Sequence, residues 1–200
     1  MFFTHSRHRF VTVVSVAALT MGAAVAAIGD AHAATIGPQQ IELAATALKP
    51  AIRLSQTGVI MFPMNPLPKC ALSKTSFGQP RPDGRTHQGI DLMASLGQEV
   101  YAVNDGVLSK QSIMGTLSGN AWYLTLPGGT YYFYAHLSAF AAGLAVGSTV
   151  TRGQLIGYVG DTGDPGEGNY HLHFEVHPLG GAAVDPYPLL TIPKSCTVYP

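Results

Sequence analysis

From about Ser73 onward, hydrophobic and polar positions alternate in short runs that are separated by turn residues. Alternation with a period of two predicts strands, and clusters of Gly, Pro and Asn predict the turns between them. We therefore expect a mostly β, antiparallel domain built from short strands. Three pairs of runs stand out: the two parts of 98–108 around Asn104-Asp-Gly106, residues 121–126 and 130–136 around Pro127-Gly-Gly129, and residues 154–159 and 171–177 around a glycine-rich loop.

The start of the chain has a different pattern, which is typical of export. Residues 1–9 carry Arg7 and Arg9 without an acid, and residues 10–28 are apolar or small apart from three hydroxyl residues. Ala31-His32-Ala33 then supplies small residues at a cleavage site. We expect residues 1–33 to be a secretory signal peptide that is cleaved, rather than a membrane anchor, although the apolar run is nearly long enough to span a bilayer. The mature protein is then expected in the cell envelope, periplasm or extracellular space.

Residues 34–72 are expected to form an N-terminal arm and a lead-in to the domain at 73–200. Apolar positions between residues 41 and 48 have helical spacing and predict a short helix or a loosely attached arm, which Pro50 ends. Three prolines between residues 63 and 68 predict extended chain after it.

Composition narrows the classes of function. Lys+Arg and Asp+Glu both number 11 and charged residues make up 11% of the chain, which excludes a strongly basic nucleic-acid-binding protein. The 46% of hydrophobic residues is enough for a core. The two cysteines, Cys70 and Cys196, lack CxxC spacing, and in an oxidising compartment we expect them to form a disulfide.

Four of the five histidines after residue 33 fall into three compact groups. Residues two apart in a strand share one face at a separation of about 6.6 Å, so His171 and His173 are expected to point the same way while Leu172 and Phe174 enter the core. The groups are His87-Gln-Gly-Ile-Asp91, His136 at the end of Tyr131-Tyr-Phe-Tyr-Ala-His136, and His171-Leu-His173.

These groups contain the donor types of a metal site. Imidazole and carboxylate both bind zinc, and we expect Gly89 to let the chain bend so that His87 and Asp91 converge. A catalytic zinc usually has three protein ligands and a water, so four histidines and one aspartate leave side chains for acid–base work in metal-assisted hydrolysis. Taken alone, His136 is more typical of a structural histidine, and His177, beside a turn, is interpreted as structural.

In this order, the groups resemble the LytM/lysostaphin-type zinc endopeptidases, which cut bacterial cell-wall peptides. The resemblance runs from about Ser73 to Leu189. It rests on Ser76-Phe-Gly-Gln79, Thr86-His-Gln-Gly-Ile-Asp-Leu92, Val100-Tyr-Ala-Val-Asn-Asp-Gly-Val107, Tyr134-Ala-His-Leu-Ser138, Val150-Thr-Arg-Gly-Gln-Leu-Ile-Gly157, Gly160-Asp-Thr-Gly163 and His171-Leu-His-Phe-Glu-Val176.

The resemblance implies a mostly antiparallel β domain with a catalytic groove lined by loops. It implies that Zn²⁺ is held by His87, Asp91 and His173, and that His136 and His171 are the catalytic pair that polarises the water and stabilises the tetrahedral intermediate. Glu175 is expected to be a partner of the site rather than the general base.

Two features of this sequence modify the resemblance. Relatives that cut glycyl-glycine often carry a tyrosine shortly before the first histidine, and residues 75–86 contain none, which argues against specificity for glycine bridges. The acidic loop at 161–170 lacks the spacing of a calcium-binding EF-hand, so we expect a solvated turn. Tyr132 and Tyr134 share the nominal strand face of His136, where they either line the groove or form a half-buried surface.

The sequence thus predicts a zinc-dependent endopeptidase that hydrolyses the stem or cross-bridge peptides of peptidoglycan. We expect a monomer whose partner is peptidoglycan, with no nucleic acid and no stable membrane insertion after signal cleavage. The alternative is a non-hydrolytic cell-wall regulator of the same fold, or a latent enzyme in which residues 34–72 cover the groove.

Overall fold

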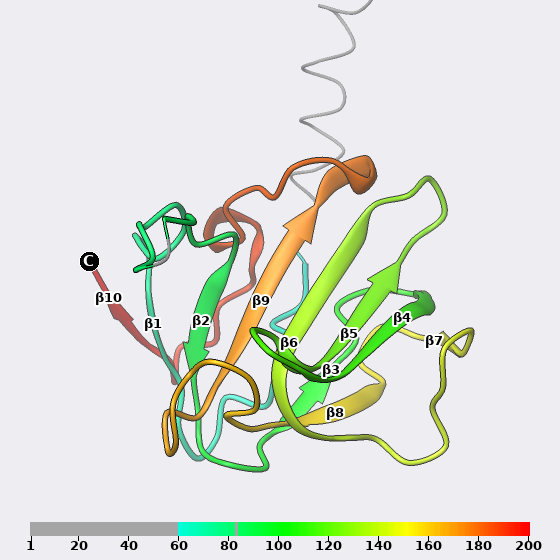
Figure 1. Ribbon diagram of the computed structural model, residues 1–200, viewed down its shortest axis with the longest axis horizontal. Helices are drawn as coiled ribbons and strands as arrows, with labels where there is room; N and C mark the ends of the chain where they lie inside the picture. Colours follow the sequence, from blue (N-terminus) through cyan, green and yellow to red (C-terminus); the bar gives the residue numbers. More distant parts are fainter. Residues whose placement is uncertain (1–59, 83) are drawn as a thin grey trace, which may run out of the picture. The chain divides into compact units, whose positions relative to one another are not determined.

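The computed structural model describes residues 60–82 and 84–200, and nearly all of its regular structure is β (Figure 1). The predicted signal peptide and residues 34–59 of the predicted arm lie outside the described residues. In the described part, no helix has the length and apolarity needed to cross a membrane. The elements are β1 Ala71–Ser73, β2 Ile90–Met93, β3 Glu99–Tyr101, β4 Gly106–Gly115, β5 Gly119–Thr125, β6 Tyr131–Phe140, β7 Thr149–Val150, β8 Leu155–Val159, β9 His171–His177 and β10 Thr197–Tyr199, with short 3₁₀ turns η1 Pro178–Gly180 and η2 Tyr187–Leu189.

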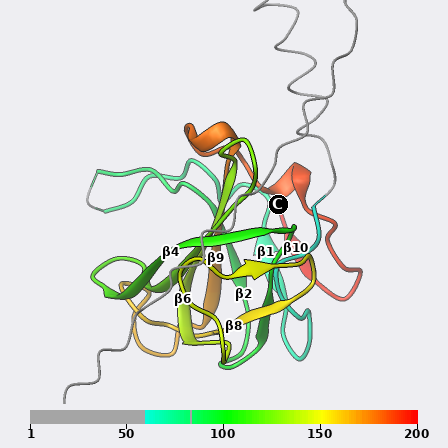
Figure 2. The ribbon, with the colours of Figure 1, turned by 90° about the vertical axis from the view of Figure 1, so that its right-hand side faces the viewer.

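The strands form one sheet in the order β10-β1-β2-β9-β6-β5-β4-β7, with β8 pairing to both β6 and β3. Figure 2 views the sheet from its β4–β7 edge. Among the named strands, all pairs are antiparallel except β1 with β10, which confirms the predicted architecture. The predicted turns at Asn104-Asp-Gly106 and Pro127-Gly-Gly129 separate β3 from β4 and β5 from β6.

Alternation along the central strands decides which side chains enter the core. In β9, Leu172 and Phe174 are fully buried in the main core, whereas His171 and His173 lie on the opposite face, as the period of two predicts. Trp122 is fully buried and donates its indole N–H to the carbonyl of Ile156, 3.0 Å away. The core residues therefore fix which face of β9 is buried, and the histidines of β9 lie on the opposite face.

Strand β6 changes partners at His136. Residues 131–135 pair with β9 and residues 137–140 pair with β8, and on the β5 side the register shifts between Asn120 and Trp122. His136 has a φ of 63°, in the left-handed region. A bulge of this kind inserts an extra residue and rotates the side chains that follow. His136 therefore leaves the core face that its position predicts and joins the face of Ala135 and His173.

This bulge separates His136 from Tyr132 and Tyr134, which neither line the groove nor form a half-buried surface. Both side chains are buried in the main core, and the Tyr134 hydroxyl accepts a hydrogen bond of 3.0 Å from the backbone N–H of Val103. The expectation that they share a face with His136 is wrong, because the bulge breaks the alternation between Tyr134 and His136.

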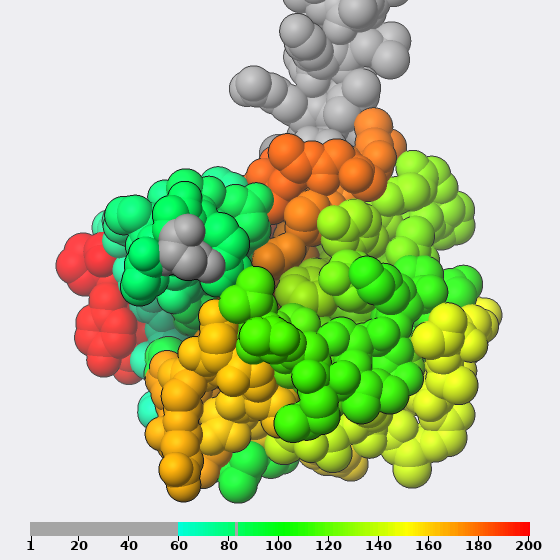
Figure 3. All heavy atoms as spheres, in the orientation of Figure 1, coloured from blue at the N-terminus to red at the C-terminus, as the bar shows by residue number. Residues whose placement is uncertain are grey.

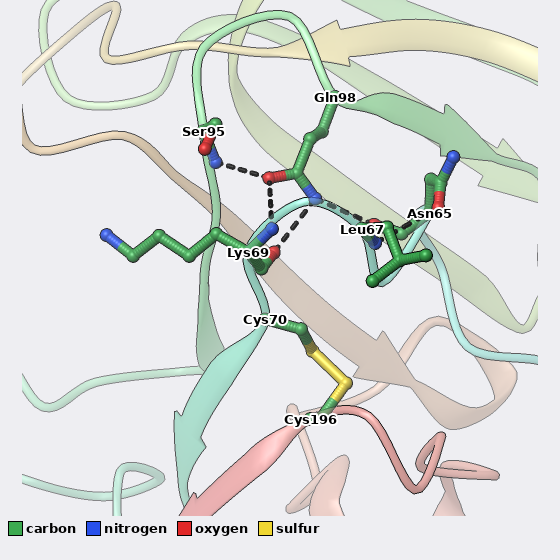
Figure 4. Close-up of a disulfide and its surroundings, with 7 residues drawn as sticks. All are labelled: Asn65, Leu67, Lys69, Cys70, Ser95, Gln98 and Cys196. Carbon is green, nitrogen blue, oxygen red and sulfur yellow. Dashed lines mark hydrogen bonds between the residues drawn. A yellow bond between two sulfur atoms is a disulfide. The ribbon is translucent and has the colours of Figure 1, made fainter.

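The lead-in is part of the packed structure from Ile60 onward. Phe62, Met64 and Leu72 belong to the main core, and Cys70 forms a disulfide with Cys196, with the two Cα atoms 4.6 Å apart (Figure 4). A disulfide that closes so long a loop removes much of the conformational freedom of the unfolded chain.

Gln98 holds the lead-in against the turn before β3 (Figure 4). Its side chain is buried, and its amide nitrogen donates to the carbonyls of Asn65 and Lys69, both 2.8 Å away. Its amide oxygen accepts the backbone N–H groups of Ser95 and Lys69. One side chain thus satisfies four partly buried backbone groups that strand pairing does not reach.

We predict that Gln98→Ala lowers the free energy of unfolding by about 1–3 kcal/mol, because it leaves several partly buried backbone groups without partners. Urea denaturation with the disulfide intact measures this loss. The exposed Gln88 supplies the matched control, and Gln88→Ala is expected to change stability by less than about 0.5 kcal/mol. Equal stability of the two variants contradicts the role given to Gln98.

Candidate metal centre

Three adjacent strands bring the predicted site residues together. In the register of β2 with β9, Asp91 lies opposite His173, and in the register of β9 with β6, His173 lies opposite Ala135. His171 opens β9, and His87 lies three residues before β2. All five predicted site residues line one cavity of about 490 Å³ on this face of the sheet.

Three donor atoms form a compact triangle at the floor of this cavity. His87 Nε2 lies 3.1 Å from Asp91 Oδ1 and 3.0 Å from His173 Nδ1, and His173 Nδ1 lies 3.0 Å from Asp91 Oδ1. Ligands about 2.0–2.1 Å from a tetrahedral zinc lie about 3.3 Å from one another. The spacing and the donor types of this group therefore fit a zinc ion.

Hydrogen bonds on the outer side of each ring select the nitrogen that faces the cavity. His87 Nδ1 donates to the carbonyl of Ser76 at 2.7 Å, which leaves the Nε2 lone pair toward the triangle. His173 Nε2 donates to Glu175 Oε1 at 2.8 Å, which leaves Nδ1 toward the triangle. The two imidazoles thus offer different nitrogens to the same point in space.

His136 and His171 stand beside the triangle with their ring centroids 4.8 Å apart. His136 Nδ1 donates to the carbonyl of Thr162 and His171 Nδ1 donates to the carbonyl of Asn169, each at 2.8 Å. Burial, with a smaller contribution from His171, lowers the pKa of His136 to about 4, and burial also lowers the pKa of His171. Both rings are therefore neutral near pH 7 and can accept a proton at Nε2.

The carboxylate of Asp91 is divided between two roles. Its Oδ1 atom belongs to the triangle, and its Oδ2 atom accepts a hydrogen bond of 2.9 Å from the guanidinium of Arg81. Burial by itself raises the pKa of Asp91, but when His173 Nδ1 and His87 Nε2 carry protons rather than a metal, their hydrogen bonds to Oδ1 outweigh burial and hold this pKa well below its usual range. The group is thus anionic, as a metal ligand must be.

Loops wall the cavity on more than one side. Residues 79–82 and 84–87 pair as the two arms of a hairpin, with hydrogen bonds between Gln79 and His87 and between Arg81 and Arg85. The turn between β4 and β5 and the acidic loop at 161–170 form the other walls, and the backbone N–H of Asp164 donates to the carbonyl of Leu117. Figure 3 shows the surface hollowed between the hairpin and the β4–β5 turn.

Gly89 is needed for space rather than for bending. A Cβ at this position would lie 2.4 Å from the carbonyl oxygen of Phe174, 2.9 Å from Glu175 Cγ and 3.0 Å from His173 Cε1. Its φ is outside the left-handed region, so the expectation of a glycine bend is corrected. The absence of a side chain lets the segment from His87 to Asp91 lie directly against β9.

We predict that Gly89→Ala lowers the free energy of unfolding by about 1–3 kcal/mol and weakens zinc binding, because the new methyl group must push β9 away. Chemical denaturation and titration with Zn²⁺ measure the two effects. Wild-type zinc affinity in this variant would show that the donors converge without this close approach.

Sequence reasoning missed two contributions to the site. Arg81 receives no role from the sequence, although its guanidinium binds Asp91. His177 was interpreted as structural, yet its Nε2 lies 2.6 Å from Glu175 Oε2. The period of two that aligned His171 with His173 extends to both Glu175 and His177, so this signal was present in the sequence.

Comparison with known proteins agrees with this geometry. The model of peptidase family M23 matches residues 85–186. An L-Ala--D-Glu endopeptidase of Bacillus subtilis is 33% identical over 129 residues, which are 58% of this chain and 39% of that protein. DD-carboxypeptidase/endopeptidase Mpg of Neisseria meningitidis is 40% identical over 102 residues, which are 51% of this chain and 22% of that protein.

A solved structure gives the same result for the fold. The crystal structure of a zinc containing peptidase from Vibrio cholerae has a TM-score of 0.52 and 27% identity, and the match covers 62% of this chain and 37% of that one. The chain therefore matches well under half the length of these relatives. The family model spans half of the chain, and its range includes the five site residues that the sequence predicts and the cavity contains. The chain therefore belongs to peptidase family M23.

Proposed function

We propose that this protein is a zinc-dependent endopeptidase that hydrolyses peptide bonds in the stem or cross-bridge peptides of bacterial peptidoglycan. The observation that carries the proposal is the triangle of His87 Nε2, Asp91 Oδ1 and His173 Nδ1 beside two neutral histidines. Two imidazoles and one carboxylate are a donor set that catalytic zinc uses, and they leave room for a substrate.

The metal is assigned to His87, Asp91 and His173. When bound there, zinc supplies Lewis acidity and a water of lowered pKa. The remaining chemistry belongs to the side chains. His136 or His171 takes a proton at Nε2 from the attacking water, and the same N–H then protonates the leaving amine. The other imidazole also presents Nε2 to the cavity, and it stabilises charge on the former carbonyl oxygen only when that nitrogen carries a proton.

The backbone prepares both imidazoles for this work. Because Thr162 and Asn169 hold the two Nδ1–H groups, each ring presents the lone pair of Nε2 to the cavity before reaction. A pKa near 4 keeps His136 unprotonated before it meets the substrate. The bulge at His136 is required for this arrangement, since a regular strand would turn the ring into the core.

The class of substrate is supported by the relatives. The Bacillus subtilis protein is named for an L-Ala--D-Glu bond and the Neisseria meningitidis protein for DD bonds. Both names specify bonds that involve D-amino acids, which are typical of peptidoglycan peptides, so we assign these peptides as the class of substrate. The absence of a tyrosine over residues 75–86 still argues against glycine bridges.

The alternative of a non-hydrolytic regulator receives no support from the site. Each ligand position and both catalytic positions hold a side chain able to act, and a regulator has no use for two neutral imidazoles aimed at a metal site. For a latent enzyme, a covering segment must lie before Ile60, because residues 60–72 contribute to the core and the disulfide.

We also propose that the protein acts after export, in the cell envelope or outside the cell. The signal-like pattern of residues 1–33 and the location of peptidoglycan both support this. The pairing of Cys70 with Cys196 adds support, because disulfides persist in oxidising compartments.

We predict that His173→Ala loses stoichiometric zinc, whereas His171→Ala retains zinc and loses turnover by about 10²–10⁴-fold. Metal analysis of the purified proteins measures the first effect. Mass spectrometry of fragments released from several peptidoglycan types, with and without a chelator, measures the second and identifies the bond.

Lys194→Ala, whose exposed side chain does not line the cavity, is the control for both measurements. Full zinc content in His173→Ala removes the ligand assignment. Full activity in His171→Ala removes its catalytic role, and fragments that a chelator does not suppress argue against metal-dependent cleavage.

A further inference from the structure

A chain of contacts continues from the proposed metal site along the same face of β9. His173 Nε2 donates to Glu175 Oε1 at 2.8 Å, and His177 Nε2 donates to Glu175 Oε2 at 2.6 Å. The three residues are spaced by two, so one strand aligns them on one face. Both oxygens of the Glu175 carboxylate are therefore engaged, one by the metal ligand and one by His177.

His177 is held by contacts on its edge and its face. Its Nδ1 atom lies 2.9 Å from the carbonyl oxygen of Gly181, beyond the 3₁₀ turn η1. Its ring stacks on Tyr131, with centroids 4.2 Å apart and planes at 10°, because the two residues lie opposite each other in the register of β6 with β9. His177 is therefore fixed independently of the metal site.

Glu175 is confined by its neighbours as well. It lies opposite Phe133 on β6, and its Cγ passes next to the bare Cα of Gly89. A glutamate in a strand has several rotamers, and the one seen here points its carboxylate between two histidines. On the side of Glu175 away from the proposed metal site, the hydrogen bond from His177 Nε2 to Oε2 selects this rotamer of Glu175.

We infer that His177 is a positioning residue for the metal centre, acting through Glu175 on His173. With both carboxylate oxygens fixed, the His173 ring has one orientation in which Nε2–H meets its acceptor and Nδ1 faces Asp91 and His87. Without the donor from His177, the carboxylate can rotate away, and the His173 ring then loses the contact that orients Nδ1. Hydrogen-bond partners behind a ligand commonly change metal affinity 10–100-fold.

The test is zinc affinity, which is measured by competition with a chromogenic chelator. His177→Phe keeps a ring to stack on Tyr131 and removes the donor to Glu175, and we expect it to bind Zn²⁺ about 10-fold more weakly than the wild type. His177→Gln restores one N–H toward Glu175 and is expected to recover most of that loss. Tyr131→Phe keeps the stacked ring and serves as the matched control, with wild-type affinity expected.

The absorption spectrum of the Co²⁺-loaded protein provides a second readout. It reports the arrangement of ligands around the metal, which a purely structural role for His177 would not alter. We expect a changed spectrum for His177→Phe and a spectrum close to the wild type for His177→Gln. Wild-type zinc affinity and an unchanged spectrum in His177→Phe overturn the inference, as does an equal loss in His177→Phe and His177→Gln.

Glu175→Gln keeps the test decisive if His177→Phe does not fold. It preserves the shape of the side chain and replaces a charged acceptor of His173 by a weaker neutral one, so about 10-fold weaker zinc binding is expected. Unchanged affinity in this variant also overturns the inference.

This inference rests on the metal site of the proposed function, not on its substrate. A wild-type protein that binds zinc and cuts no peptidoglycan removes the proposed substrate and leaves the role of His177 intact. A wild-type protein that binds no zinc removes the metal site itself, and this outcome is seen before any variant is measured.

Discussion

The pairing of β9 with β2 on one side and β6 on the other is the constraint on which the site depends. It places Asp91 and Ala135 on either side of His173. A slip of β9 by one residue would turn the side chains of β9, His173 among them, to the opposite face. The register is held by the core. Leu172 and Phe174 are completely buried on the reverse face, so any slip exposes them to solvent.

The sheet positions most of the site residues, whereas the loops supply the carbonyl groups that orient three of the histidine rings. Each of His87, His136 and His171 donates one N–H to a backbone carbonyl of a loop, and this bond decides which nitrogen faces the cavity. The acceptors are spread along the chain, in the segment before the hairpin and near both ends of the acidic loop. The tautomers of these three rings are therefore set by loop carbonyls, whereas burial keeps His136 and His171 neutral.

His136 shows how a departure from regular structure serves the site. A left-handed backbone at a residue other than glycine is unfavourable by about 1–2 kcal/mol. It persists where β6 leaves β9 and joins β8, because the pairings on both sides of His136 fix the backbone there. The same bulge places one imidazole in the cavity while keeping Tyr134 in the core.

The sequence by itself determined the β architecture, the strands and turns around the site, and the side chains that gather there. Short-range periodicity and turn chemistry carry that information, and His171 and His173 share a face because of the strand period alone. Only the tertiary structure decided the rest. The bulge at His136, the need for an absent Cβ at Gly89 and the bond from Arg81 to Asp91 all depend on which distant segments meet. No local pattern encodes such contacts, because they arise from pairing between strands that are far apart in the chain.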